Sequence, residues 1–156
     1  ESMGGMLALC LASEHPEIIA VVTYAPAMIT PSSSSKWQIQ ILSWFKPYMP
    51  KPQRPPNITD ERTKSYTVNP LKAVIQFFDL QRETRRRLPR ISQPILNIQG
   101  RLDVVIDPRN GDVIFQEVKS QIKEMHWLEN STHVLILDQE WERAAELTLN
   151  FIQTIE

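Results

Sequence analysis

Three side chains in this sequence are of the types, and in the order, that suit nucleophilic catalysis. Ser2 stands in ESMGG, Asp103 in QGRLDVVIDP and His133 in ENSTHVLILDQE. A serine hydroxyl is a weak nucleophile that needs a nearby base, and imidazole titrates close to neutral pH. A carboxylate can hold that imidazole in one tautomer and stabilise its protonated form. The sequence therefore predicts that Ser2 attacks, His133 carries the proton and Asp103 orients His133.

Ser2 precedes two glycines and an apolar run, which indicates a sharp turn leading into a helix. Such a turn exposes the serine oxygen, and Gly4 and Gly5 would let the helix approach a neighbouring strand without Cβ clashes. The helix N-terminus presents backbone N–H groups to developing negative charge, so the Met3 N–H is a candidate oxyanion-hole donor. The alternative is that Ser2 only caps the helix, since serine is favoured at that position.

Other histidines and carboxylates compete for the same roles. His15 stands where the first helix should end, and His126 lies inside a predicted strand, so both are weaker candidates for the base. Asp107 is the rival acid, but it precedes a proline and is expected to cap the next helix. His133 could also be an ordinary surface-loop histidine, although the VLIL run behind it indicates a constrained loop. Asp103 and His133 remain the preferred acid and base.

The elements that must position these side chains alternate between strands and helices. A short, nearly uninterrupted apolar run predicts a buried strand at residues 18–25, and we expect a second buried strand at residues 94–100 and a third, short strand at residues 123–130. Helical spacing predicts helices directly after Ser2 and at residues 70–87, 108–122 and 138–155. Strands separated by such helices run parallel, with helices on both faces of the sheet. Ligands of open parallel sheets bind outside the carboxyl ends of the strands, where all three candidate catalytic residues are expected.

Residues 31–69 break this alternation and are predicted to form an inserted cap, or lid. They contain a serine run and five prolines between residues 47 and 56. Trp37, Trp44 and Phe45 belong to an apolar group at roughly helical spacing. We expect part of this group to pack on the carboxyl end of the sheet and part to cover the serine, where it would bind an acyl chain. Trp37, Trp44 and Phe45 are therefore candidate substrate-binding residues.

The composition indicates a globular domain with a small-molecule substrate. The 17 basic and 18 acidic side chains leave a formal charge of −1, which gives no overall footprint for nucleic acid or an anionic membrane. The sequence contains no metal-binding spacing of cysteine and histidine, no phosphate loop and no dinucleotide fingerprint, so we expect neither a metal nor a cofactor. No apolar run reaches the roughly 18 residues of a membrane span. We expect a cytoplasmic protein, with an export signal ahead of residue 1 left open.

Together these features resemble the α/β-hydrolase family, and within it the lidded bacterial carboxylesterases and monoacylglycerol lipases. The resemblance rests on SMGG around Ser2, VVTYAPAM before the lid, PILNIQGRLDVVIDP around Asp103 and NSTHVLILD around His133. The order Ser, Asp, His is also that of the family. The family's turn reads Gly-x-Ser-x-Gly, and its first glycine would precede Glu1. The resemblance implies that residues 1–156 are the C-terminal part of one domain, with the N-terminal strands and the second oxyanion loop upstream.

The resemblance further implies a serine hydrolase that cleaves carboxylic esters with an apolar acyl group through an acyl-enzyme. Two other functions stay open: an acyltransferase or thioesterase that uses the same three residues, and a non-catalytic binding protein that keeps the fold. Because one oxyanion donor would lie upstream, we expect the isolated 156-residue chain to have little or no activity. We also expect the strand at residues 18–25 to have an unpaired edge.

Overall fold

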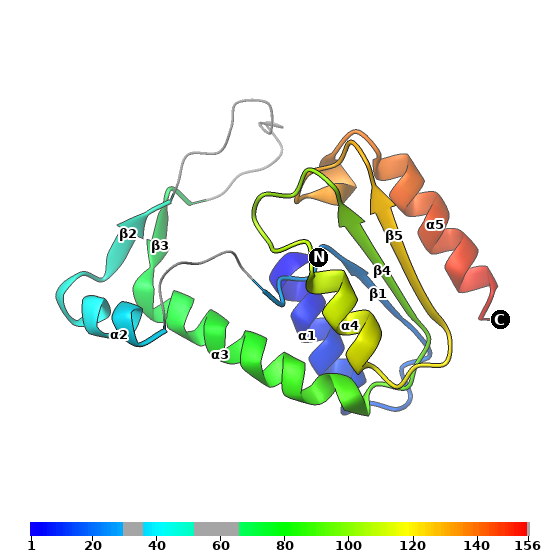
Figure 1. Cartoon of the computed structure of the whole chain (residues 1–156), viewed down its shortest axis with the longest axis horizontal. Helices are drawn as coiled ribbons and strands as arrows, with labels where there is room; N and C mark the ends of the chain where they lie inside the picture. The colour runs from blue at the N-terminus through cyan, green and yellow to red at the C-terminus, as the bar shows by residue number, and fades with distance from the viewer. Residues whose placement is uncertain (30–35, 52–65, 156) are drawn as a thin grey trace.

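The computed structural model describes residues 1–29, 36–51 and 66–155, and a three-stranded parallel sheet lies at its centre (Figure 1). The strands are β1 (Val21–Tyr24), β4 (Ile95–Gly100) and β5 (Lys123–Leu128), in the order β1-β4-β5. Val21 pairs with Ile95, and Ile95 pairs with Lys123. The three strands therefore end at the same edge of the sheet. The predicted α/β class with three parallel strands is confirmed, and β1 and β5 form the edges of the described sheet.

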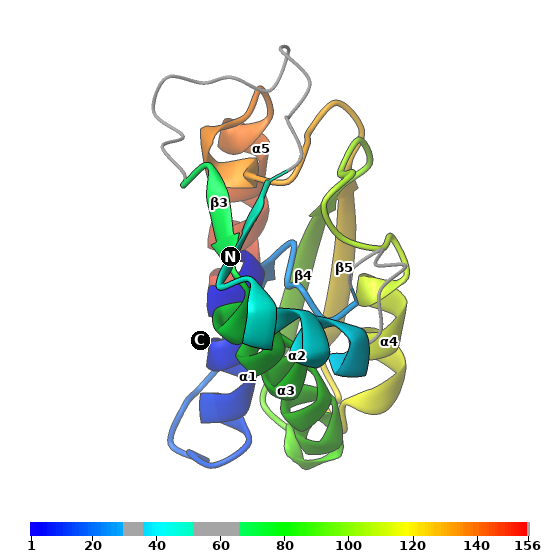
Figure 2. The same ribbon diagram turned by 90° about the vertical axis from the view of Figure 1, so that its left-hand side faces the viewer.

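Helices cover both faces of this sheet. α1 (Ser2–Ala12), α3 (Leu71–Arg87) and α4 (Asn110–Glu117) lie on one face, and α5 (Trp141–Gln153) lies on the other (Figures 1 and 2). Two short 3-10 turns, Leu88–Arg90 and Leu135–Leu137, follow α3 and precede α5. β4 is buried along its whole length because it is the central strand and is covered on both faces.

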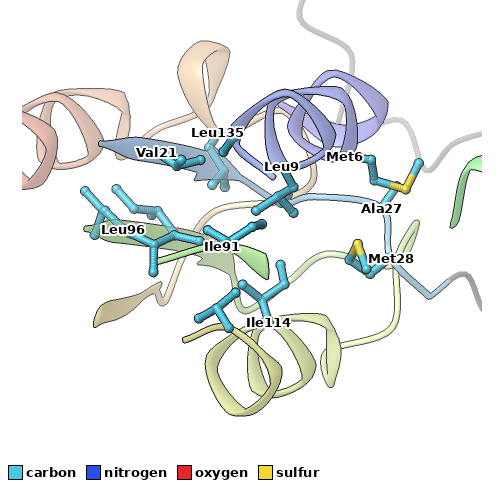
Figure 3. Close-up of a cluster of buried hydrophobic side chains, with 14 of the residues drawn as sticks. Met6, Leu9, Val21, Ala27, Met28, Ile91, Leu96, Ile114 and Leu135 are labelled. Carbon is cyan, nitrogen blue, oxygen red and sulfur yellow. The ribbon is translucent and has the colours of Figure 1, made fainter. Parts of the chain in front are cut away.

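The main hydrophobic core fills the layer between the sheet and its helices. Met6 and Leu9 of α1 and Ile114 of α4 belong to one buried cluster, with Ile91 and Met28 lying between the two helices (Figure 3). Each of these side chains is fully or almost fully buried. This packing fixes α1 against the sheet, and α1 begins at Ser2.

The largest differences from the element boundaries expected from the sequence occur in β1, α4 and α5. β1 begins at Val21 rather than residue 18, since Ile19 is exposed and the Ile18 N–H donates to the His15 carbonyl in a turn. α4 ends at Glu117, because the chain then turns so that the Lys119 N–H donates to the Ile91 carbonyl. The last helix begins three residues later than expected, at Trp141. In β1 and α4 the apolar pattern extends past the end of the element, into residues whose backbone N–H groups bond outside it.

The described part of the cap comprises α2 (Lys36–Phe45) and a small antiparallel hairpin of β2 (Tyr48–Pro50) and β3 (Val68–Pro70). No strand was expected in this segment from the sequence, so this pair of strands is a correction. None of these elements joins the three-stranded sheet. Ile39 of α2 packs on Leu71 and Ile75 of α3, so the buried part of the cap's apolar group lies on a helix rather than on the sheet edge. The rest of the predicted insertion lies outside the described residues.

Candidate active site

The structure brings Ser2, His133 and Asp103 into one chain of contacts at the carboxyl ends of the strands. His133 Nε2 lies 2.9 Å from Ser2 Oγ, and His133 Nδ1 lies 2.7 Å from Asp103 Oδ2. The side chain of Asp103 is 2% exposed and that of His133 is 9% exposed. The hydroxyl thus contacts the imidazole, and the imidazole contacts a buried carboxylate. This is the geometry that activates a serine as a nucleophile.

Ser2 adopts a strained backbone conformation at the start of α1. Its φ is 51°, in the left-handed region that costs a non-glycine residue about 1–2 kcal/mol. The cap position of α1 belongs to Glu1, and no side chain caps the helix, so the alternative interpretation of Ser2 as a cap is wrong. The Ala27 N–H donates to the Ser2 carbonyl at 3.2 Å and ties this turn to the segment after β1. Strain held in place by such contacts is typical of functional turns.

The two glycines after Ser2 have different surroundings. A Cβ on Gly5 would lie 3.0 Å from Pro26 Cβ, so glycine allows α1 to approach the end of β1 closely. A Cβ on Gly4 would meet nothing within 4 Å. The expectation that both glycines serve helix packing is therefore correct for Gly5 and wrong for Gly4.

Asp103 is held by the turn that follows β4. The N–H groups of Val105 and Ile106 donate to Asp103 Oδ1 at 2.7 and 3.2 Å, which leaves Oδ2 for His133. At the end of the strand, a Cβ on Gly100 would lie 2.3 Å from the Thr132 carbonyl oxygen. Only glycine therefore permits the strand to pass so close to the segment that carries His133.

Asp107 and the other two histidines have partners elsewhere. Asp107 pairs with the Arg109 guanidinium at 2.7 Å, and hydrogen bonds from the Arg109 side chain and backbone lower the pKa of Asp107 to about 2. His15 contacts Glu17, and His126 contacts Glu124. Among the competing residues, the structure thus places Asp103 rather than Asp107 on His133.

Two carboxylates that the sequence analysis did not assign to the site hold the loop of His133. Asp138 Oδ2 accepts from the Thr132 N–H at 2.5 Å and from its hydroxyl at 2.6 Å. Burial acts to raise the pKa of Asp138, yet the Thr132 hydrogen bonds hold it below its ordinary value. Glu140 Oε2 accepts from the Asn130 N–H and the Ser131 hydroxyl. In the sequence, the feature that could have indicated this role is the presence of two acids five and seven residues after His133.

Glu1 is a third carboxylate next to this loop. Burial raises the pKa of its carboxyl group, while the backbone N–H of Leu135 acts in the opposite direction. Its Oε1 is buried and makes no hydrogen bond. The residue before Ser2 therefore faces the turn that follows His133.

The Met3 N–H lies in the first turn of α1, where no carbonyl of the same helix can accept it. This donor belongs to the residue directly after Ser2, the position at which a helix N-terminus favours negative charge. The side chain of Met3 is half exposed. The geometry therefore leaves the Met3 N–H free of helix bonding beside the serine.

The three candidate substrate-binding residues of the cap lie on its outer surface. Trp37, Trp44 and Phe45 are 64%, 71% and 79% exposed. The opposite side of α2, with Ile39, packs on α3. The structure thus places these aromatic side chains away from the contact between α2 and α3.

Residues 1–29, 36–51 and 66–155 contain no cluster of three or more His, Cys, Asp or Glu side chains that could hold a metal ion. Within the same residues, every helix is too short or too polar to cross a bilayer.

Among curated proteins, the chain is similar to two bacterial esterases. It is 31% identical to a thermostable monoacylglycerol lipase of Bacillus sp. (strain H-257), over 96% of this chain and 59% of that protein. It is 26% identical to a carboxylesterase of Bacillus subtilis (strain 168), over 99% of this chain and 62% of that protein. The chain therefore spans about three fifths of the length of these curated relatives.

Solved structures and a family model agree with this similarity. A metagenome-derived lipolytic enzyme matches 98% of this chain and 62% of its own, with a TM-score of 0.83 and 31% identity. A monoacylglycerol lipase of Paleococcus ferrophilus matches with a TM-score of 0.78 at 21% identity, over 99% of this chain and 66% of its own, which supports the fold. The model described as serine aminopeptidase, S33 matches residues 1–140. The chain therefore belongs to the serine aminopeptidase S33 family and has an α/β-hydrolase fold.

Proposed function

We propose that this protein is a serine hydrolase that cleaves carboxylic esters, with Ser2, His133 and Asp103 as its catalytic residues. The observation that carries the proposal is the continuous contact from Ser2 Oγ through the His133 ring to Asp103 Oδ2. The names of the relatives, a monoacylglycerol lipase and a carboxylesterase, favour an ester as the substrate.

The proposed reaction has two steps. His133 Nε2 takes the proton of Ser2 as Oγ forms a bond to the ester carbonyl carbon, and the Met3 N–H donates to the developing oxyanion. The ester C–O bond then breaks, and His133 returns the proton to the leaving alcohol. In the second step His133 takes a proton from water, the resulting hydroxide attacks the acyl carbon, and the free acid leaves as Ser2 recovers its proton.

Asp103 acts through His133 rather than on the substrate. Its Oδ2 accepts the Nδ1 hydrogen, which leaves the Nε2 lone pair directed at Ser2. Its negative charge, buried beside the ring, stabilises the imidazolium that forms during both steps. The two backbone N–H groups on Oδ1 keep the carboxylate in the required orientation.

The surroundings of the site favour an apolar acyl or alcohol group. Met3, Val104, Val105 and Ile136 flank the three catalytic residues in sequence, and each exposes a large part of an apolar side chain. We assign Trp37, Trp44 and Phe45 a role in contacting the apolar part of the substrate from the cap. An acylglycerol, the substrate class in the name of one relative, has the apolar chain that such surfaces contact.

The activity is proposed for the full-length protein. We infer that a second oxyanion donor comes from outside the 156 residues, since the chain spans about three fifths of its curated relatives. Removing one such donor typically lowers the rate about 10²- to 10³-fold. The isolated 156-residue chain should therefore hydrolyse esters slowly or not at all.

Hydrolysis of p-nitrophenyl esters by the full-length protein tests the proposal. We expect Ser2→Ala to abolish turnover and Ser13→Ala, which changes a serine bonded to the Cys10 carbonyl at the end of α1, to leave it within about twofold. Product analysis with added alcohols and thiols distinguishes ester hydrolysis from the two alternative functions. Acyl transfer in preference to hydrolysis would indicate an acyltransferase, and tight ester binding without turnover would indicate a binding protein.

A further inference from the structure

The side chain of Asn110, the first residue of α4, is fully buried and bonds to two backbone segments. Its Oδ1 accepts the Ile29 N–H at 2.6 Å, and its Nδ2 donates to the Ile29 carbonyl at 3.0 Å. The same Nδ2 donates to the Asp107 carbonyl. None of these groups takes part in the proposed proton transfers, so the structure holds a polar contact that the reaction described above does not use.

The backbone groups around Asn110 match the hydrogen-bonding capacity of a carboxamide. A carboxamide has an acceptor oxygen and two N–H hydrogens, and here one N–H meets the oxygen and two carbonyls meet the nitrogen. A carboxylate has no hydrogen to donate, and a serine hydroxyl has only one. A buried backbone group that loses its partner costs free energy. The asparagine at this position therefore fits the segments that it holds, whereas an aspartate or a serine would leave a carbonyl without its donor.

Ile29 ends a segment, residues 25–29, that we call the stem because it leads from β1 towards the cap. β1 ends at Tyr24, so the stem lies beyond the pairing of β1 with β4. Within the stem, Ala27 is buried in the main core, and its N–H donates to the Ser2 carbonyl at 3.2 Å. The stem is therefore bonded to the turn that carries the proposed nucleophile.

The far end of the stem is bonded to the loop that carries the proposed acid. The Asp107 N–H donates to the Ile29 carbonyl at 3.0 Å, beside the bond from Asn110. Asp107 and Asp103 belong to the same loop, between β4 and α4. The nucleophile and Asp103 must both stay in contact with one imidazole ring, and small displacements of such groups lower the rate steeply. The spacing of the two loops across the stem therefore matters for the reaction.

We propose that Asn110 is a positioning residue for ester hydrolysis, which through the backbone of Ile29 fixes the loop of Asp103 relative to the turn of Ser2. The inference rests on the proposed function, since it gives Asn110 a role in that reaction. Asn110 acts through the acid rather than on the substrate. Its loss should therefore lower kcat and leave KM nearly unchanged.

Steady-state kinetics of full-length Asn110→Ser test this role. Serine has one donor hydrogen in place of two, so it cannot replace all of the bonds. Fluorophosphonate labelling carried to completion counts the molecules with a reactive Ser2, and kcat is expressed per labelled molecule. We expect kcat for a soluble ester to fall about 30-fold, with KM within about twofold. Asn150→Ser, at an exposed position of α5, is the matched control and should leave both constants within about twofold.

A double-mutant cycle with Asp103→Asn shows whether Asn110 acts through the acid. In the Asp103→Asn background, Asn110→Ser should lower kcat by about twofold at most, because the acid that it positions is already absent. A further loss as large as that in the unmodified background would overturn the proposal. So would a smaller labelled fraction with unchanged kcat per labelled molecule, since that result describes a residue needed only for folding.

A second variant and a measurement without turnover keep the test independent of one substitution. Asn110→Asp keeps the shape and the acceptor for the Ile29 N–H but loses both donors, so it should lower kcat per labelled molecule by about tenfold or more. In Asn110→Ser the Ile29 amide should exchange its hydrogen about tenfold faster or more, while the amides of β4 keep their protection. Unchanged exchange at Ile29 would overturn the proposal. Turnover that survives Ser2→Ala would instead contradict the proposed function, which separates the two failures.

Discussion

The loops at the carboxyl ends of β4 and β5 and the cap are held in two different ways. Carboxylates bonded to backbone N–H groups fix the loops: Asp103 holds the turn after β4, and Asp138 holds the loop of His133. The cap is joined to the rest of the described structure through a small apolar contact between α2 and α3 and the ion pair of Lys36 with Asp79. Its outer surface is aromatic and exposed.

This difference separates the residues that set the geometry of the proposed chemistry from those that we assign to contact with the substrate. A hydroxyl, an imidazole and a carboxylate must stay at hydrogen-bond distance, because small displacements of catalytic groups lower the rate steeply. A surface that contacts apolar molecules needs only accessible area. We therefore expect changes in the loops to affect catalysis, and changes in the cap to affect binding.

The largest effect is expected from the acid. Asp103→Asn should lower kcat for a soluble ester by about 10⁴-fold, because an asparagine stabilises the wrong tautomer of His133. Asp107→Asn is the matched control four residues away and should change kcat by about twofold at most. Steady-state kinetics on both variants at pH 7 provide the measurement. Equal losses in the two variants would contradict the assignment of Asp103.

A steric change between the two loops should come next. Gly100→Ala places a Cβ against the Thr132 carbonyl, so we expect an activity loss and about 3 kcal/mol of lost unfolding free energy. Gly4→Ala is its counterpart in α1, where the added Cβ meets open space and should stabilise the protein by about 1 kcal/mol. Denaturant unfolding of both variants tests this contrast. Similar stabilities would show that the loops do not pack as described.

Asp138→Asn should have a smaller effect that depends on pH. The folded pKa of Asp138 lies below its unfolded value near 3.8, so its carboxylate stabilises the fold above that pH and loses this contribution as the pH falls through the lowered pKa. We expect the variant to be about 1.5 kcal/mol less stable at pH 7, with the difference shrinking under acidic conditions. Unfolding measured from pH 7 to pH 3 checks this. A pH-independent difference would argue against the charge as its source.

The smallest effect on catalysis is expected from the cap's anchor. Ile39→Ala weakens the contact with Leu71 and Ile75 and should destabilise the cap locally by about 1.5 kcal/mol. Hydrogen exchange should become faster in α2 while the amides of β4 keep their protection. Faster exchange in β4 as well would mean that the cap and the sheet unfold together.

The sequence predicted the sheet and the residues at its edge well, for physical reasons. β4 holds Ile95, Leu96 and Ile98 in a short segment that ends in glycine, which is typical of a buried strand, although Asn97 and Gln99 interrupt its apolar pattern. Ser2, Asp103 and His133 come into contact because the three parallel strands end at one edge of the sheet. The order of the predicted strands and helices along the sequence is enough to indicate such a sheet.

Other features depended on contacts between segments that are distant in the sequence. The β2–β3 hairpin pairs short, proline-containing segments that no alternation marks. A sharp turn was expected at Ser2, but its left-handed φ was not, and neither was the left-handed φ of 43° at Ala25. The aromatic residues of α2 fit the periodicity of a packed helix, and only the structure shows which side of α2 meets α3.

Covalent labelling with a fluorophosphonate tests the central proposal most directly. In the full-length protein, Ser2 Oγ should displace fluoride from phosphorus, and mass spectrometry should locate the added phosphonyl group on Ser2. Ser2→Ala should carry no label, and His133→Ala should react at least about 10³-fold more slowly. Labelling of Ser2→Ala at the rate of the unmodified protein would contradict the account.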